Sequence, residues 1–467
     1  MRRILWAKSD SISPQLLVDI FSQVCRGEMS LPICPNLKDL ALELQFNAND
    51  LSNTRLISIF LHPGVQSLAI YGFLSSSPVD TRVRYTLDRV AQDIARLSPN
   101  LKSLTLSTRR NPVSSDTVRL FQQKFSEIFG IINTNALEHL YLSPGFLTGA
   151  IVEQLSHAPL LADLSICCST NDTWGFQEYS DVYTALELYV QPTFQGHCYQ
   201  ALTSITLCME LGMVTNVLWD NHFPAHQLNN LTVRATSGNV GNNAIRTFLH
   251  AFSTRCPQVR TLYLALDIEG NDPSTEEMIT AQTLLPLRSA VQLETLLIRD
   301  DRPLTLVSKA ELLHLLAPLT RLRTAWIIPD PTWPDRSHPP LMRLHIHDIP
   351  DFLEGHPELT SLGLYMSVSP IDAPAPNPIR QLEELYFGNS PCPRSLRKAM
   401  VLGHHARGHS RVAVGAYPWK QFGIQWIQSQ GGLAEDFDQW LWTQWHSARY
   451  SDVEKGRARA PRIIGRE

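Results

Sequence analysis

CPNLKDLAL (residues 34–42), SPNLKSLTL (98–106) and HPELTSLGL (356–364) are three copies of the stretch that decides the fold. Each contains Leu-x-x-Leu-x-Leu, and a proline stands two residues before the first leucine. Successive side chains of a strand point to opposite faces, so the two leucines of Leu-x-Leu share one face. Proline disfavours helix in the residue before it and lacks an amide donor, so it ends a helix where a strand begins. The pattern therefore predicts a helix, a proline stop and a half-buried strand.

The pattern recurs from residue 34 to beyond residue 380. Further copies are HPGVQSLAI (62–70), NALEHLYL (135–142), PLLADLSI (159–166), QALTSITL (200–207), HQLNNLTV (226–233), CPQVRTLYL (256–264), VQLETLLI (291–298) and RQLEELYF (380–387). LRTAWI (322–327) and LMRLHI (341–346) match less well and lie close together, so at most one of them is expected to be a full repeat. The segments between copies predict helices over residues 87–97, 115–129, 149–157, 242–253 and 309–316.

Strands joined by helical crossovers run parallel, and right-handed connections stack them into one curved sheet. We therefore expect an α/β fold, a leucine-rich-repeat solenoid shaped like a horseshoe, with parallel strands on the concave face and helices on the convex face. A single unit buries only a few large side chains at roughly 1.5–3 kcal/mol each, which cannot offset the ordering of about 30 residues. Each repeat therefore needs its neighbours.

Composition limits the classes of partner. The net charge of -4 and the pI near 6.5 give no general attraction to polyanions, so no nucleic-acid partner is expected. No stretch has the length and hydrophobicity of a signal peptide or a membrane span, which predicts a cytoplasmic or nuclear protein without a membrane partner. Eight cysteines in 467 residues are too sparse for a disulfide framework and are expected to be reduced.

The chain resembles the leucine-rich-repeat region of fungal F-box proteins, on its CPNL-x-x-L-x-L and HP-x-L-x-x-L-x-L copies, over about residues 34 to 390. The resemblance implies that the repeats hold the substrate of an SCF-type ubiquitin ligase, while an N-terminal F-box docks a Skp1-like adaptor. SPQLLVDIF (13–21) is similar to the opening helix of an F-box. Possible adaptor contacts are then Pro14, Leu16, Leu17, Ile20 and Phe21.

The F-box itself is expected to be truncated or absent. Only fifteen residues separate Phe21 from Leu37, which leaves no room for the remaining helices of an F-box. The alternative is that residues 13–25 form the convex helix of a first repeat.

The pattern divides the chain into four parts. Residues 1–33 are expected to be an N-terminal helix or cap, 34–392 the irregular repeats, 393–450 a C-terminal cap and 451–467 a disordered basic tail. An aromatic insertion at about 169–200 either packs back onto the rim of the sheet or forms a recognition lobe. Five of the ten tryptophans fall between residues 419 and 445, which favours a cap over the last repeat, with a partner-binding helix as the alternative.

Residues that flank the strand leucines face the concave side, and their character changes along the chain. Early and middle repeats present mostly small or polar side chains, whereas later repeats present tyrosine, tryptophan, arginine and histidine, the first three of which are enriched at interface hot spots. We therefore expect a protein substrate or peptide on the C-terminal half of the concave face. The candidate contacts are Arg234, Tyr263, Arg299, Trp326, Arg343, His345, Tyr365 and Tyr386.

No catalytic signature is present: GxGxxG, GxxxxGK[ST], GxSxG and HExxH are all missing. The alternating histidines of His345-Ile346-His347-Asp348 could share one strand face, but we expect no metal and no other cofactor. Three hypotheses remain: a substrate-receptor-like scaffold of the ubiquitin system, a stand-alone binding module, and a regulator of an enzyme.

Overall fold

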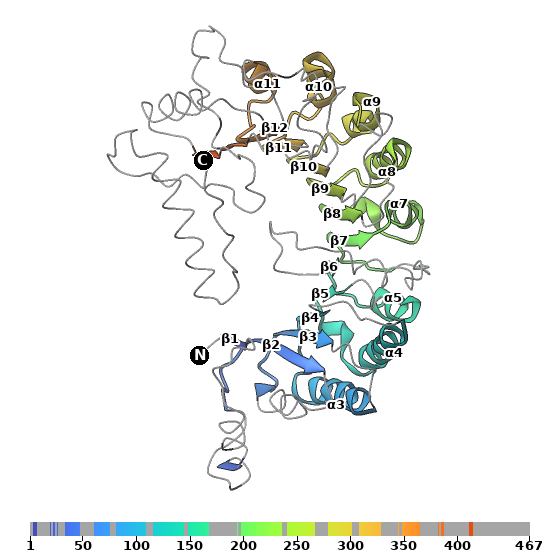
Figure 1. Ribbon diagram of the computed structural model, residues 1–467, viewed down its shortest axis with the longest axis vertical. Helices are drawn as coiled ribbons and strands as arrows, with labels where there is room; N and C mark the ends of the chain where they lie inside the picture. The colour runs from blue at the N-terminus through green and yellow to red at the C-terminus, as the bar shows by residue number, and fades with distance from the viewer. Residues whose placement is uncertain are drawn as a thin grey trace, which may run out of the picture.

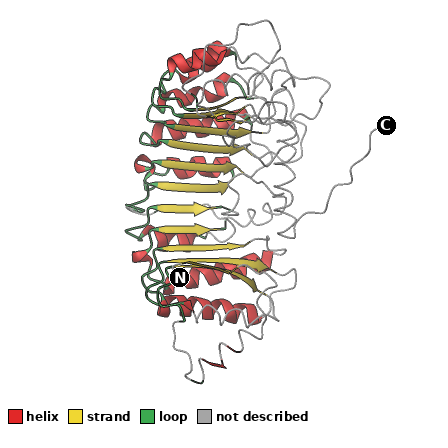
Figure 2. Ribbon diagram, turned by 90° about the vertical axis from the view of Figure 1, so that its left-hand side faces the viewer, coloured by secondary structure: helices red, strands yellow, loops and turns green. Residues whose placement is uncertain are grey.

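A computed structural model shows one curved sheet of parallel strands with helices along its outer side (Figure 1). It describes residues 3–6, 33–46, 60–74, 81–108, 115–143, 148–167, 198–235, 241–266, 279–300, 308–327, 348–364, 384–386 and 411–413, and single residues 19, 22, 23, 26, 194, 344 and 382. The fourteen strands of this part follow one another in chain order from β1 to β14. Figure 2 shows them stacked and pointing the same way, with the helices behind.

The strands are short and evenly stacked. They are β1 (Arg3–Trp6), β2 (Asp39–Phe46), β3 (Ser67–Leu74), β4 (Ser103–Thr108), β5 (His139–Leu142), β6 (Asp163–Ile166), β7 (Ser204–Met209), β8 (Asn230–Ala235), β9 (Thr261–Leu266), β10 (Thr295–Asp300), β11 (Thr324–Ile327), β12 (Ser361–Leu364), β13 (Glu384–Tyr386) and β14 (Arg411–Ala413). The predicted fold is confirmed: this is an α/β leucine-rich-repeat solenoid, and its repeated leucines form the buried row between sheet and helices.

The helices lie on the convex side. They are α3 (Thr81–Leu97), α4 (Ser115–Ile131), α5 (Gly149–Ser156), α7 (Leu211–Trp219), α8 (Asn242–Arg255), α9 (Ala281–Leu284), α10 (Lys309–Leu316) and α11 (Ile349–Gly355). The five predicted helices are confirmed, with α3 beginning six residues before the predicted start at 87. The sequence did not predict α7, α9 or α11.

A four-residue turn leads into most strands. The amide of the first leucine donates to the carbonyl three residues earlier, for example Leu37 to Cys34 and Leu359 to His356. Where a proline precedes the motif it is the second residue of this four-residue segment, a position that suits its fixed φ. Proline therefore shapes the approach to the strand in addition to following the end of the helix.

The first residue of most of these turns is buried, and these residues form a second buried row. Ser98 and His356 belong to this row, with 2% and 1% of their surface exposed. The Ser98 hydroxyl donates to the carbonyl of His62 in the preceding repeat, at 3.1 Å. His356 lies between two carbonyl oxygens, that of Phe352 at 2.9 Å from Nδ1 and that of Leu316 at 2.9 Å from Nε2. The Ser98 hydrogen bond and the Nε2 contact of His356 each tie one repeat to the preceding one.

A ladder of shared carbonyls links consecutive repeats at the entrance to the strands. The carbonyl of Lys38 accepts from the amides of both Gln66 and Ser67, and the carbonyl of Gln66 in turn accepts from the next repeat. The same arrangement continues without a break to the carbonyl of Arg323, which accepts from Thr360 and Ser361. Each repeat therefore donates to the repeat before it.

The ends of the sheet differ from the sequence prediction. Residues 1–33 were expected to be an N-terminal helix or cap, and within them Arg3–Trp6 form β1, which pairs in parallel with β2. Asp19, Ser22 and Gln23 are helical, as predicted for the segment 13–25. The sheet also passes the predicted boundary at 392, because β14 pairs with β13. The rest of the predicted cap at 393–450, with its tryptophans, and the tail at 451–467 lie outside the described residues.

Of the two weak repeats, the first provides a described strand. LRTAWI provides β11, and β11 pairs directly with β12, with Thr324 opposite Ser361 and Ile327 opposite Leu364. No strand from residues 341–346 can therefore stand between them. A strand in a sheet pairs with one neighbour along each edge, and β12 already pairs with this edge of β11.

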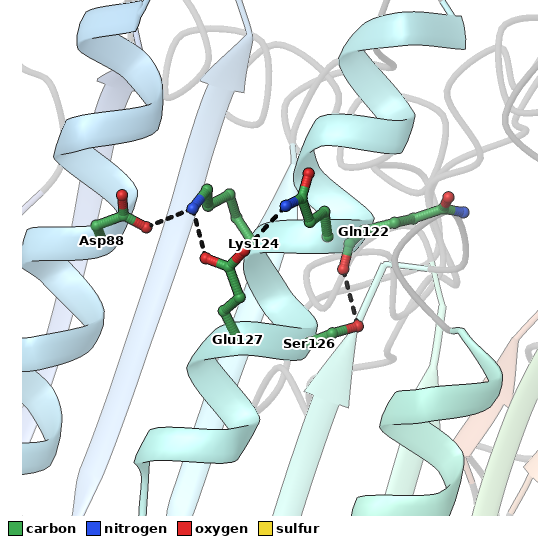
Figure 3. A network of polar contacts seen from close by, with 6 residues as sticks. Asp88, Gln122, Lys124, Ser126 and Glu127 are labelled. Atoms are coloured by element: carbon green, nitrogen blue, oxygen red, sulfur yellow. Dashed lines mark hydrogen bonds and ion pairs between the residues drawn. The ribbon is translucent and has the colours of Figure 1, made fainter.

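Charged side chains connect the convex helices. The Lys124 ammonium on α4 lies 2.8 Å from a carboxylate oxygen of Asp88 on α3 and also contacts Glu127, while the Ser126 hydroxyl donates to the Gln122 carbonyl (Figure 3). Burial alone would lower the pKa of Lys124, but its hydrogen bonds to both carboxylates and their charges raise the pKa above its ordinary value. The ammonium therefore stays charged and serves to join two helices.

Candidate functional site

Three rows of side chains face the concave side of the sheet, because residues alternate between faces along each strand. The first row stands before the second leucine: Asp39, Ser67, Ser103, His139, Asp163, Ser204, Asn230, Thr261, Thr295, Thr324 and Ser361. The middle row stands between the last two leucines: Ala41, Ala69, Thr105, Tyr141, Ser165, Thr206, Thr232, Tyr263, Leu297, Trp326 and Gly363. The last row follows the third leucine.

Four of the eight predicted contacts lie together on neighbouring strands. Arg234, Tyr263, Arg299 and Trp326 belong to β8, β9, β10 and β11, and all four residues are half-buried. Tyr263 stands opposite Leu297, and Leu297 stands opposite Trp326, so the three form an unbroken part of the middle row.

The two arginines of this group belong to the last row. Ala265 on β9 is the register partner of both Arg234 and Arg299. Because neighbouring strands are about 4.8 Å apart, the two arginine Cα atoms are separated by roughly 10 Å. An arginine side chain is long enough for both guanidinium groups to reach one extended segment that crosses the strands. Ala265, which lies between them, is buried.

Trp326 is held in place by the next strand. Its indole Nε1 donates to the Ser361 hydroxyl at 2.8 Å, and a Cβ added to Gly363 would lie 2.7 Å from Cγ of the indole. The ring therefore lies against the backbone of β12, and only glycine leaves room for it. A tryptophan fixed in this way is preorganised to offer a flat surface, because it loses little rotamer freedom when a partner binds.

The remaining predicted contacts are not brought into this group. Arg343, His345 and Tyr365 lie outside the described residues, and so do the possible adaptor contacts Pro14, Leu16, Leu17, Ile20 and Phe21. For Tyr386 the backbone is described: it stands opposite Gly363 and so continues the middle row. Its side chain is outside the described part.

The sequence prediction missed an earlier group on the concave face. Tyr141 belongs to the middle row, and in the first row Nδ1 of His139 lies 3.9 Å from a carboxylate oxygen of Asp163 on the next strand. Partial burial raises the pKa of Asp163, while a hydrogen bond with Ser204 and the nearby His139 oppose that shift. The alternation that predicts Tyr263 on the concave face also applies to Tyr141 in the NALEHLYL copy.

The concave face is divided by charge. Asp39, His139 and Asp163 lie on β2, β5 and β6, whereas Arg234 and Arg299 lie on β8 and β10. Among the described concave positions of β8–β11, the three rows contain no carboxylate. Arg234 and Arg299 are therefore the charged residues of the described concave positions on β8–β11.

The end of the aromatic insertion packs into the core between repeats. Phe194 and Tyr199 are buried, with ring centroids 6.0 Å apart, and Phe194 lies 5.2 Å from Phe223. The Tyr199 hydroxyl donates to the Val152 carbonyl at 3.0 Å, and the Gln227 amide donates to the Tyr199 carbonyl at 2.8 Å. The described part of the insertion thus supports the interpretation that it is fastened to the solenoid. Residues 168–193 lie outside the described residues.

Within the described ranges, no group of three or more histidine, cysteine, aspartate or glutamate side chains is placed to hold a metal ion. Of the alternating His345-Ile346-His347-Asp348 cluster, only Asp348 is described, and its carboxylate lies 3.2 Å from the Lys309 ammonium. In the same part of the chain no helix is both long and apolar enough to cross a membrane.

Comparison with known proteins gives matches among solved structures. No family model matches the chain, and no curated protein matches it. Among solved structures, a chain of the complex of Rad7 and Elc1 in yeast is similar, with 13% sequence identity, 75% of this chain and 74% of that chain covered, and a TM-score of 0.39. The repeat geometry of the chain itself defines its class, and the protein is a leucine-rich-repeat solenoid.

Proposed function

We propose that the protein is a non-catalytic scaffold that binds an extended segment of a partner protein across β8–β11. The observation that carries this proposal is the unbroken group of Arg234, Tyr263, Leu297, Arg299 and Trp326 on one face of four neighbouring strands. Aromatic residues and arginine dominate interface hot spots, because they bury large areas and keep polar groups available. Elsewhere on the described face small and hydroxylated side chains prevail.

The partner segment is expected to carry acidic groups. Arg234 and Arg299 favour aspartate, glutamate or phosphorylated side chains, which guanidinium groups bind through paired hydrogen bonds. A hydrogen bond to a charged group contributes about 1.5–3 kcal/mol, so two such contacts account for a large part of a micromolar affinity. Apolar side chains of the segment would lie against Leu297 and the Trp326 ring.

Site-directed photocrosslinking tests this placement. We would introduce a photoreactive phenylalanine at Tyr263 or, as a matched control in the same row, at Ala69 on β3. The expected result is crosslinking of a partner from position 263 and not from position 69, with at least a tenfold loss in the Arg234→Gln, Arg299→Gln double variant. Equal crosslinking from both positions, or a yield that the double variant leaves unchanged, would sink the proposal. Circular dichroism establishes that each variant is folded.

We also propose that the scaffold serves as a substrate receptor of an SCF-type ubiquitin ligase inside the cell, with a Skp1-like adaptor at its N-terminus. This finer proposal is supported by the resemblance of the repeats to fungal F-box proteins. It is also supported by the helical conformation of Asp19, Ser22 and Gln23, in and next to the segment similar to an F-box helix. Co-purification of the full chain with a recombinant Skp1-like adaptor tests it. Absence of a complex at micromolar concentrations would leave the stand-alone scaffold, or the regulator of an enzyme, as the function.

A further inference from the structure

Two cysteines of the last concave row stand side by side on neighbouring strands. Ile166 on β6 is the register partner of Leu207 on β7, so the next residues, Cys167 and Cys208, are opposite each other. The Cys167 amide donates to the Leu142 carbonyl at 2.9 Å, which extends the sheet by one residue at this point. Both residues are buried, with 3% of their surface exposed, and both are reduced thiols in the structure. The two thiols therefore lie on the same face of the sheet, in the same row, and are equally buried.

The curvature of the sheet brings such a pair within bonding reach. Neighbouring strands are about 4.8 Å apart, which lies inside the Cα separation of about 4.4–6.8 Å that a disulfide accepts. The sheet is curved (Figure 1). Side chains on the inner side of a curved sheet converge, so their Cβ atoms are expected to be closer than their Cα atoms. A disulfide needs Cβ atoms at roughly 3.5–4.5 Å. A modest tilt of the two side chains is then sufficient.

The surroundings of this pair differ from those of the other buried cysteines. Arg234 on β8 is the register partner of Cys208, so the next strand places a positively charged side chain in the same row. Positive charge stabilises a thiolate, the form that attacks. By contrast, burial raises the pKa of Cys256 to about 12, and the nearby Arg255 only partly opposes this shift. Cys198 donates to the His222 carbonyl at 2.9 Å. Neither of these two has a cysteine as register partner.

We propose that Cys167 and Cys208 form a paired-thiol site that closes into a cross-strand disulfide when a two-electron oxidant is supplied. With a diazene such as diamide, the first thiolate adds to the N=N bond. The second thiolate then attacks the first sulfur, the S–N bond breaks and the S–S bond forms. The two electrons and both thiol protons leave on the resulting hydrazine. The bridge would join the two strands between which the insertion at 169–200 leaves and rejoins the sheet.

Thiol counting with matched variants tests the site in the full-length chain. The folded protein is treated with diamide, denatured and blocked with N-ethylmaleimide, and its mass and unreduced peptides are measured. The expected wild-type result is the loss of two of the eight thiols, with one linked pair of peptides joining 167 and 208. Cys167→Ser and Cys208→Ser should each keep all remaining thiols, whereas Cys198→Ser, Cys256→Ser and Cys168→Ser should still lose two. Burial will slow the reaction, so its end point is measured.

Several results would overturn the proposal. These are an unchanged thiol count in the wild type, a link that survives Cys167→Ser or Cys208→Ser, and a link that disappears in Cys168→Ser. A link that forms only in urea would also overturn it, because it would arise from the unfolded chain. The peptide map of the wild type decides the matter even if a serine variant does not fold.

Discussion

The contact between Trp326 and Gly363 allows a sharp test of the concave surface. Replacing Gly363 with alanine would put a methyl group 2.7 Å from Cγ and 3.0 Å from Cδ1 of the indole. Ordinary carbon contacts need about 3.5–4 Å, so the ring must move or the strands must separate. Movement of the ring breaks its hydrogen bond with Ser361, which costs about 1 kcal/mol, and overpacking costs about 1–3 kcal/mol. We expect Gly363→Ala to destabilise the protein by roughly 1–3 kcal/mol.

The same change should have the opposite effect once the indole is gone. In a Trp326→Ala background the methyl group meets no ring, and alanine is favoured over glycine within a strand by about 0.5–1 kcal/mol. The double-mutant cycle should therefore give a coupling of roughly 1.5–4 kcal/mol between the two positions. Urea unfolding followed by circular dichroism measures it, and hydrogen exchange of residues 361–364 locates it. An equal cost of Gly363→Ala in both backgrounds would refute the packing described here.

Three further predictions concern single buried or charged groups. His356→Leu leaves two buried carbonyls without their ring partner and should lower the free energy of unfolding by about 2–5 kcal/mol. Faster hydrogen exchange in α10 and α11 would show this loss, and exchange as slow as in the wild type would contradict it. Lys124→Met should lower the free energy of unfolding by roughly 1.5–3 kcal/mol at pH 7. Because the folded state raises the pKa of Lys124, that deficit should be full below about pH 10.5 and shrink above it, and a pH-independent deficit would exclude the ion pairs as its cause. Asp163→Asn should stabilise the protein slightly at pH 7, because folding raises the pKa of this carboxyl and so disfavours its charged form, and the gain should vanish below the ordinary pKa near 3.8; a loss of stability at pH 7 would refute it.

The repeats themselves could be predicted from sequence because their signal is local. Leu-x-x-Leu-x-Leu fixes strand, buried face and register at once, and helices such as α4 have an apolar stripe that repeats with helical spacing. Helix α7 was not predicted, because its local sequence is ambiguous. Its sequence LGMVTNVLW is short and mostly apolar, and a short apolar run does not distinguish a helix from a strand.

Elements that depend on distant partners could not be predicted. Arg3–Trp6 has no leucine pattern and becomes a strand only because β2 offers an edge for pairing. LMRLHI resembled a repeat, and the direct pairing of β11 with β12 shows that no strand lies between these two. In the candidate site, alternation predicted that Trp326 faces the concave side. The role of Gly363 depends on its register with Trp326, which is 37 positions away in the chain. The local sequence around these two residues does not indicate that register.

In the ladder of shared carbonyls, each repeat donates to the repeat that the ribosome has synthesised just before it. From Lys38 to Arg323, each repeat supplies two amide donors to a carbonyl of the repeat before it. When a new repeat emerges during synthesis, the carbonyl that accepts its amides is therefore already in place. Its own carbonyl stays exposed until the following repeat forms. An unsatisfied carbonyl is tolerated more readily than an unsatisfied amide, so the unfinished end of a nascent chain is the less costly one. Growth from the N-terminus can thus proceed one unit at a time on a template that the chain has just completed.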